Sequence, residues 1–316
     1  MMTDYTVSEK AFPLIVVVGG ANMDIGGKPD GPLREKDSNP GRVQTSVGGV
    51  GRNIAHNLRL LNLPVTFLTA LGKDPYGDRV VAECAMAGID CERVLRTHDE
   101  STSTYLFIAD EAGDMRLAIS DMAICSLINP AYLAGQRDLL DTADVLVLDA
   151  NLPEETIRYL AETCTVPIFA DPVSVSKAGK LKNVLGRLHT LKPNRLEAEQ
   201  LTGIFIHTDV DLARAADALL ATGLKRVFLS LGTEGVFAAE AGQRIHVPCC
   251  PAVPKNMTGA GDAMLAGLVW SYLQEKDLVS SARLAAAAAA IAVEGTRTVN
   301  PALSPSALLE KAALCL

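Results

Sequence analysis

The sequence predicts an α/β fold built on an open, mostly parallel sheet flanked by helices. Short apolar runs recur along the chain, segments with helical periodicity lie between them, and no long linker or internal repeat interrupts the alternation. The chain has 316 residues, of which 48% are hydrophobic, enough for a sizeable core. We therefore expect residues 1–316 to form a single domain.

The expected strands are uninterrupted apolar runs rather than alternating ones, which is typical of strands buried on both faces of a parallel sheet. These runs cover residues 14–18, 65–71, 144–148, 167–170 and 227–231. Between them, Ile54, Leu58 and Leu61 recur at helical spacing, so they share one face of a helix starting near Gly51. Segments 211–220 and 263–273 show the same pattern. Strands alternating with helices favour parallel pairing through crossover helices.

Two segments depart from this alternation. Residues 25–47 are rich in glycine and proline, and residues 93–121 contain short strand-like stretches around a turn at 110–114. Neither shows the periodicity of a crossover helix. We expect them to form a small β-sheet lid over the edge of the main sheet at which its strands end.

Charge and cysteine usage argue against several classes of protein. The 29 basic and 37 acidic residues give a formal net charge of −8 with no Lys/Arg block, which argues against a nucleic acid polymer as partner. The seven cysteines are scattered without metal-ligand spacing, so we expect free thiols in a reducing compartment. Residues 1–10 are polar and the apolar run 284–293 is too short to span a bilayer. We expect a cytoplasmic protein with no membrane partner.

The strongest chemical signal is the sequence Thr-Gly-Ala-Gly-Asp at 258–262, directly before a predicted helix. Small residues allow close approach of the backbone to a ligand, and a helix N-terminus presents free N–H groups to anions. An isolated Gly-Asp would be only a favourable first-turn charge. The full pattern instead combines an anion cradle with a carboxylate base, which is what phosphoryl transfer requires.

This pattern resembles the C-terminal signature of the PfkB-type, ribokinase-like sugar and nucleoside kinases. Further motifs occur in the family's order: Gly20-Ala-Asn-Met-Asp24, Gly48-Gly-Val-Gly-Arg-Asn53, Asn194-Arg-Leu-Glu197 and Ser230-Leu-Gly-Thr-Glu-Gly235. Each alone could be a turn or a helix cap. Together they extend the resemblance over residues 14–295. It implies a ribokinase-like sheet with a β lid, and a kinase that uses ATP and Mg²⁺.

The resemblance also implies a role for individual residues. It assigns the catalytic base to Asp262 and an anion hole to Gly259, Ala260 and Gly261. The residues expected to bind substrate are Asn22, Asp24, Asn39, Gly48, Gly49 and Asn53. Those expected to bind the nucleotide are Lys192, Asn194, Gly232, Thr233, Gly235 and Thr258. Glu197 and Asn194 are expected to hold Mg²⁺ through water.

Within the family, the turn at 37–41, the segment 190–199 and Asn256 resemble the branch that phosphorylates the 5′-hydroxyl of pseudouridine. Ser38, Asn39, Thr102 and Thr104 are then candidates for reading the base. Dependence on K⁺ stays open, because many relatives carry aspartate where this chain has Asn256. The resemblance also suggests a homodimer formed through the lids.

Other functions share parts of this pattern. Ribose, a fructose-type sugar or another nucleoside could be the substrate, and a binding-only relative could use the same fold, although it would not need Asp262. A nicotinamide dehydrogenase is excluded because residues 19–24 lack the spacing Gly-x-Gly-x-x-Gly. The chain also contains no P-loop motif.

Overall fold

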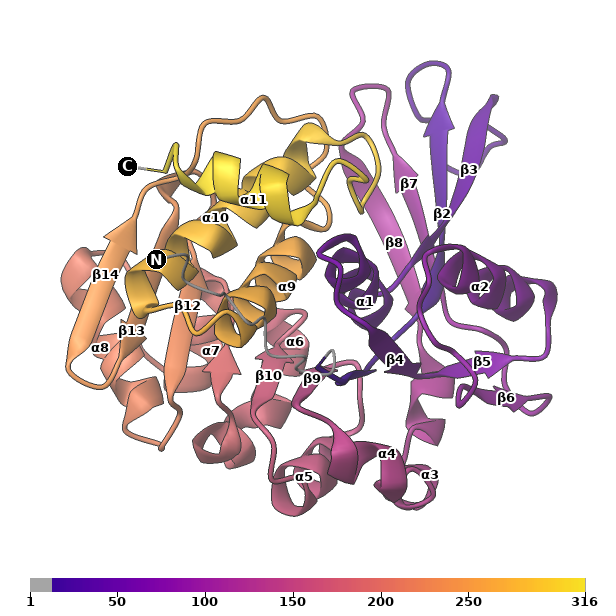
Figure 1. Ribbon diagram of the computed structural model, residues 1–316. Coiled ribbons are helices and arrows are strands. Elements are labelled where there is room, and N and C mark those ends of the chain that lie inside the picture. The colour runs from indigo at the N-terminus through magenta and orange to yellow at the C-terminus, as the bar shows by residue number, and fades with distance from the viewer. Residues whose placement is uncertain (1–12, 316) are drawn as a thin grey trace, which may run out of the picture.

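A computed structural model describes residues 13–315 of the chain, in which a central eight-stranded sheet has the order β14-β13-β12-β11-β10-β9-β1-β4 (Figure 1). Its strands are β1 (Ile15–Val18), β4 (Val65–Leu68), β9 (Val145–Asp149), β10 (Ile168–Asp171), β11 (Thr190–Leu191), β12 (Arg226–Ser230), β13 (Val236–Glu240) and β14 (Gln243–Val247). The pairs β12–β13 and β13–β14 are antiparallel and all others are parallel. The predicted open, mostly parallel sheet is confirmed.

Helices cover both faces of this sheet, which explains why its strands are apolar throughout. Ile15 and Val17 pack on one side, while Val16 and Val18 pack on the other. The first side carries α1 (Val50–Leu60), α2 (Pro75–Met86), α9 (Ala260–Leu273), α10 (Leu278–Glu294) and α11 (Pro305–Ala312). The second carries η1 (Ala123–Leu127), α3 (Pro130–Ala134), α4 (Arg137–Thr142), α5 (Glu154–Thr163), α6 (Val175–Ala178), η2 (Gly179–Arg187), α7 (Arg195–Thr202) and α8 (Asp209–Leu220).

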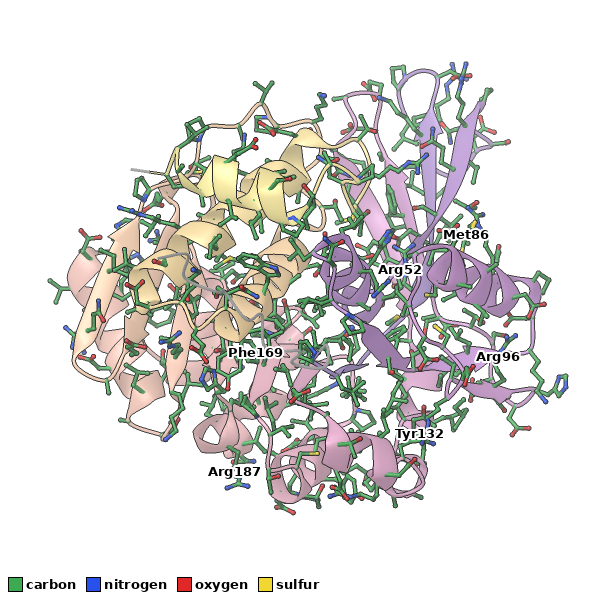
Figure 2. All side chains as sticks on the ribbon, in the orientation of Figure 1. Arg52, Met86, Arg96, Tyr132, Phe169 and Arg187 are labelled. Atoms are coloured by element: carbon green, nitrogen blue, oxygen red, sulfur yellow. A yellow bond between two sulfur atoms is a disulfide. The ribbon has the colours of Figure 1, made fainter. Side chains whose placement is uncertain are left out.

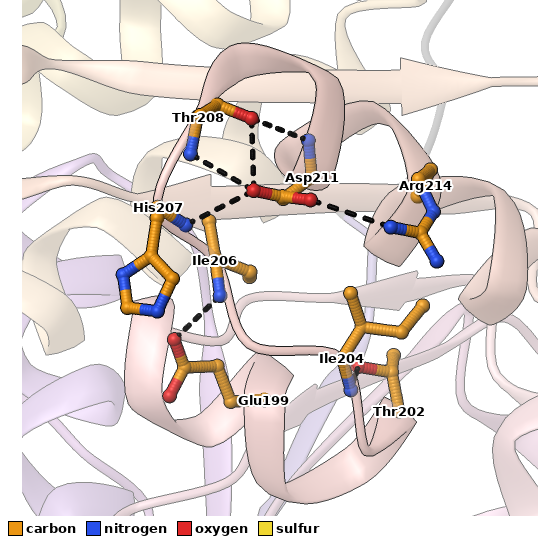
Figure 3. Close-up of polar contacts among 8 residues, drawn as sticks. All are labelled: Glu199, Thr202, Ile204, Ile206, His207, Thr208, Asp211 and Arg214. Carbon is orange, nitrogen blue, oxygen red and sulfur yellow. Dashed lines mark hydrogen bonds and ion pairs between the residues drawn. The ribbon is translucent and has the colours of Figure 1, made fainter.

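Helix α8 begins two residues before the predicted start because Thr208 caps it (Figure 3). The Thr208 hydroxyl oxygen accepts from the Asp211 backbone N–H at 3.3 Å, and the Asp211 carboxylate accepts from the Thr208 backbone N–H at 3.1 Å. This reciprocal capping box satisfies N–H groups that have no partner inside the helix.

A smaller sheet stands beside the central one and has the order β3-β2-β7-β8 (Figure 1). Its strands are β2 (Asn22–Pro29), β3 (Gly41–Gly48), β7 (Thr104–Ala109) and β8 (Met115–Asp121). They come from the two segments singled out in the sequence. Residues 93–103 differ, because β6 (Leu95–Thr97) pairs instead with β5 (Ala70–Gly72) in a separate two-stranded sheet.

The order of the central sheet reverses at β1, which lies between β4 and β9. The connections that follow β1 and β9 therefore leave in opposite directions. In open α/β sheets the crevice at such a switch point, beyond the carboxyl ends of the strands, is where ligands bind. The small sheet begins four residues after β1, so it rises from the rim of this crevice.

The expectation that all cysteines are free thiols is wrong for one pair. Cys250 and Cys315, 65 residues apart in the sequence, form a disulfide that ties the C-terminal segment to the chain following β14. Both residues are buried, so packing brings together two thiols whose spacing gives no signal in the sequence. Among residues 13–315, no helix is long and apolar enough to cross a membrane.

Candidate active site

Charged side chains converge where the central strands end. Asp149 is the last residue of β9, Asp171 is the last residue of β10, and Lys192 directly follows β11. All three are buried. Because parallel strands end at the same edge of the sheet, residues 21 to 43 positions apart meet in one crevice, opposite the start of α9.

Asp262 lies in the first turn of α9, which begins after Gly259 adopts a left-handed conformation with φ of 87°. A side chain at Gly259 would collide with the Thr298 backbone oxygen, so this sharp entry into the helix requires glycine. The Asn53 side-chain amide on α1 donates to Asp262 Oδ2 at 2.9 Å. Burial, followed by the negative charge of Asp171, raises the pKa of Asp262 to about 7. A carboxyl with that pKa can accept a proton near neutral pH.

The start of α9 also forms a site suited to an anion. The first N–H groups of a helix have no partner within it, and here they belong to the segment Gly259, Ala260 and Gly261. Lys192 Nζ lies close by, only 3.0 Å from the position that a Cβ on Gly261 would occupy. Glycine at 261 therefore leaves room for the ammonium group.

Lys192 forms a buried ion pair with Asp171, with 3.2 Å between Nζ and Oδ2. Burial, the largest single influence, would lower the pKa of Lys192, but the negative charges of Asp171, Glu197 and Asp262 and the hydrogen bond to Asp171 together outweigh it. The pKa is therefore raised and the lysine stays protonated. A fixed cation beside free backbone N–H groups can stabilise charge on a transferring phosphoryl group.

A second group of residues lies where β2 begins and β3 ends. The Asn22 side-chain amide donates to Asp24 Oδ1 at 2.7 Å, and burial raises the pKa of Asp24. A side chain at Gly48 would collide with the Asp24 carboxylate, and one at Gly49, whose φ is 97°, would collide with the Gly20 backbone. The structure thus brings Asn22, Asp24, Gly48 and Gly49 together around one carboxylate, which can accept from hydroxyl groups.

Asp149 was not identified from the sequence, although a carboxylate ending an apolar strand was a visible signal. It is fully buried, and its oxygens accept from the Gly20 N–H at 2.9 Å and the Asn151 N–H at 2.8 Å. Burial raises its pKa. Its contact with Gly20 fixes the turn that leads into β2, so Asp149 supports the position of Asn22 and Asp24 without reaching them.

Arg52 is another residue that the sequence reasoning missed. It lies on α1 (Figure 2), where its guanidinium group donates to Asn53 Oδ1 at 3.0 Å and pairs with Glu83 of α2 at 3.2 Å. Because Asn53 in turn donates to Asp262, Arg52 helps to orient the amide that holds the carboxylate. Arginine immediately before the motif asparagine was the only local sign of this role.

Asn194 and Glu197, expected to bind the nucleotide and Mg²⁺, lie at the start of α7. Asn194 and Glu197 form a reciprocal capping box, with Asn194 Oδ1 accepting from the Glu197 N–H at 2.9 Å and Glu197 Oε2 accepting from the Asn194 N–H at 2.8 Å. Burial raises the pKa of Glu197. Within residues 13–315, no three His, Cys, Asp or Glu side chains form a metal-binding cluster. The arrangement suits Mg²⁺, which needs few protein ligands when phosphates and waters complete its shell.

Gly232, Thr233 and Gly235 lie in the short turn η3 (Gly232–Glu234) and directly after it. Arg195 at the start of α7 donates to both carboxylate oxygens of Glu234, so this loop is tied to the helix that carries Glu197. Thr258 is exposed just before α9, and its N–H donates to Asn256 Oδ1 at 2.9 Å. The expected nucleotide residues thus belong to the loops after β11 and β12 and before α9.

Two candidates for substrate recognition have other partners. Asn39 lies in the loop between β2 and β3, where its side chain accepts from the Arg34 N–H and donates to the Arg34 backbone oxygen. Thr102 is buried and donates to Asp74 at 2.8 Å. The structure therefore gives Asn39 a role in shaping the loop, and its contact with substrate stays a prediction.

Comparison with known proteins identifies the family. The model of the pfkB family of carbohydrate kinases matches residues 13–305. The chain is 38% identical to the pseudouridine kinase of Escherichia coli over 92% of this chain and 93% of that protein. It is 40% identical to the uncharacterized sugar kinase YeiI of the same organism, over 95% of this chain and 83% of that protein. A carbohydrate kinase structure from Agrobacterium tumefaciens superposes with a TM-score of 0.83 at 31% identity, and the match covers 96% of this chain and 98% of that one. The chain therefore belongs to the pfkB family of carbohydrate kinases, phosphotransferases that act on an alcohol group.

Proposed function

We propose that this kinase transfers the γ-phosphoryl group of ATP to the 5′-hydroxyl of pseudouridine. The observation that carries the proposal is Asp262, a buried carboxylate with a pKa of about 7 beside a helix N-terminus and a fixed lysine. The likeness to pseudouridine kinase over 92% of the chain supports the choice of substrate. Binding alone would not require a base at this position.

In this proposal Asp262 removes the proton from the 5′-hydroxyl as its oxygen attacks the γ-phosphorus. The bond from the γ-phosphorus to the bridging oxygen breaks, and ADP leaves. The N–H groups of residues 259–261 and the Lys192 ammonium group stabilise charge on the transferring oxygens, because they are already in place before the reaction. A positioned general base typically contributes about 10²–10⁴-fold to the rate.

In this proposal the ribose hydroxyls are held by Asp24 and Asn22, together with Asn53 and the backbone at Gly48 and Gly49. Mg²⁺ would supply charge neutralisation on the phosphates, with Glu197 and Asn194 contacting its waters. The side where the nucleotide would bind carries Lys192, Thr258 and the loop containing Gly232, Thr233 and Gly235. The small sheet would close over the substrate and keep out water that could otherwise hydrolyse ATP.

The outward face of the small sheet supports a homodimer. Large apolar side chains are exposed on it, at Val43, Leu106, Ile108, Leu117 and Ile119. A contiguous apolar face of this kind marks an interaction surface, and a second copy could cover it with the same residues. Light scattering of the purified chain tests this directly: a monomeric mass at micromolar concentration contradicts the dimer.

A coupled ADP-release assay tests the function. The panel consists of pseudouridine, uridine, cytidine, adenosine, inosine, ribose and fructose, and we expect the highest kcat/KM for pseudouridine. The likeness to a sugar kinase makes ribose and fructose the main rivals. A higher kcat/KM for one of the other compounds refutes the substrate while leaving the kinase chemistry intact. No ADP release above background from any of them favours a binding-only relative.

A further inference from the structure

A cavity of about 460 Å³ lies on the inner face of the small sheet, a size typical of small-molecule sites. Its lining includes Asp24, Gly26, Gln44, Ser46 and Phe107. Because Asp24 is part of this lining, the cavity continues directly from the place proposed for the ribose.

The register of the sheet sorts the lining residues into cross-strand rows. Asp24 pairs with Ser46 on β3, and Gly26 pairs with both Gln44 on β3 and Phe107 on β7. Side chains two residues apart on a strand share a face, so these rows point into the same cavity. The strand rise of about 3.3 Å per residue places the second row roughly 7 Å beyond the Asp24 row. A base attached to a ribose held by Asp24 would lie over that second row.

The second row has the chemistry of a base-binding surface. Gly26 has no side chain, and the Phe107 ring occupies the space that one would fill, with Cζ only 2.5 Å from the position that a Cβ on Gly26 would take. Glycine at position 26 thus permits the ring to lie across the strand and to form one wall of the cavity. An aromatic ring there offers a surface on which a planar base can stack.

Gln44 stands at the other end of this row with an exposed side chain that forms no hydrogen bond to another part of residues 13–315. Its carboxamide can accept and donate at the same time. Pseudouridine carries an N1–H beside its C2 carbonyl on the edge away from the ribose, and this pair matches a carboxamide. At the equivalent ring position uridine has only a C–H, which cannot donate such a bond.

We propose that Phe107 and Gln44 form the base subsite, in which Phe107 stacks on the pyrimidine ring and Gln44 reads the N1–H and C2 carbonyl of pseudouridine. The inference rests on the proposed function. It assigns base recognition to the middle of β3 and β7, whereas Ser38, Asn39 and Thr102 lie outside the lining of the cavity. A competing occupant is a phosphosugar, because Lys28 and Arg42 also line the cavity.

The test compares kcat/KM of the full chain for pseudouridine, uridine, ribose and fructose 6-phosphate. We expect Gln44→Leu to lower kcat/KM for pseudouridine by roughly 10–100-fold with a smaller loss for uridine, because pseudouridine loses two hydrogen bonds to the carboxamide, whereas uridine, which presents only a carbonyl on the equivalent edge, loses one. We expect Phe107→Leu to lower kcat/KM for both nucleosides by roughly tenfold, since stacking does not distinguish them. The residual kcat/KM for ribose is expected to stay constant in both variants. The matched control is Gln243→Leu on β14, which lies outside the cavity lining.

Equal losses for ribose and for the nucleosides would overturn the base subsite, as would an unchanged ratio of pseudouridine to uridine turnover in Gln44→Leu. Preferred turnover of fructose 6-phosphate by the wild-type chain would overturn it in favour of the phosphosugar. Calorimetric titration of pseudouridine into each variant provides a second readout, with weaker binding expected for both variants and unchanged affinity overturning the proposal. If the wild type prefers another nucleoside, the proposed function fails. The stacking role of Phe107 is then decided by whether Phe107→Leu lowers kcat/KM for that nucleoside more than it lowers kcat/KM for ribose.

Discussion

Replacing Asp262 with asparagine is expected to abolish most activity and to stabilise the fold. Burial raises the pKa of this carboxyl from 3.8 to about 7. The folded state therefore favours the protonated form, and keeping the group ionised at neutral pH costs free energy. A shift of about three units corresponds to about 4 kcal/mol as an upper limit, at 1.36 kcal/mol per unit. Asparagine preserves the shape and can still accept from Asn53 without carrying the charge.

The sign of this effect depends on pH in a defined way. Below pH 3.8 the carboxyl is protonated in both folded and unfolded chains, so the substitution changes little. Between pH 4 and 7 the unfolded chain is ionised while the folded site holds its proton, so the advantage of asparagine grows. Above pH 7 the advantage is constant. At about 2 °C per kcal/mol for a chain of this size, Tm should rise by up to about 8 °C.

Thermal unfolding followed by circular dichroism at pH 5, 6, 7 and 8 measures this difference. The exposed Asp114→Asn serves as the matched control, for which we expect a small change in Tm. A Tm difference for Asp262→Asn that does not vary between pH 5 and 7, or a less stable variant at pH 8, would refute the reasoning. The activity of the wild type should rise with pH through about 7, because only the ionised carboxylate can act as base.

Three further substitutions follow from the site. Asp24→Asn should raise KM for the phosphate acceptor at least about tenfold and spare KM for ATP, because a charged acceptor of hydroxyl protons is lost; initial-rate kinetics decide this, and an unchanged KM contradicts it. Glu197→Gln should raise the Mg²⁺ concentration for half-maximal activity, and a curve that superposes on the wild type would leave Glu197 as a helix cap. The wild type should work equally well in K⁺ and Na⁺, since Asn256 Oδ1 already accepts from the Thr258 N–H, whereas Asn256→Asp should make K⁺ stimulatory. Stimulation of the wild type by K⁺ would contradict this.

The parts of the molecule that could be predicted are those with local signals. The apolar runs of the central strands and the small residues before Asp262 each occupy a short stretch of sequence. Pairs of distant residues were not accessible in this way. The row containing Gln44 and Phe107 depends on the register of three strands, and the Asp171–Lys192 pair depends on two strands ending together.

The same reasoning explains why the expectation of free thiols throughout was wrong. The Cys250–Cys315 disulfide joins residues whose separation carries no motif. The contact of Asn39 with substrate, expected from its place in a turn that resembles the family pattern, stays a prediction, and the structure shows its amide bonded to the backbone of Arg34. Asn and Asp side chains commonly bond to nearby backbone in turns, and that alternative competes with any role in ligand binding.

The hydrogen bond from Asn53 to Asp262 spans 209 residues of chain. On the ribosome, the asparagine emerges long before its partner is made, so no partly synthesised chain ending before α9 can contain the complete catalytic pair. Contacts of such long range form late, because closing the chain between them costs entropy that only the finished core offsets. During refolding from denaturant, kinase activity should therefore return with the slowest structural phase and not with the early gain of helix.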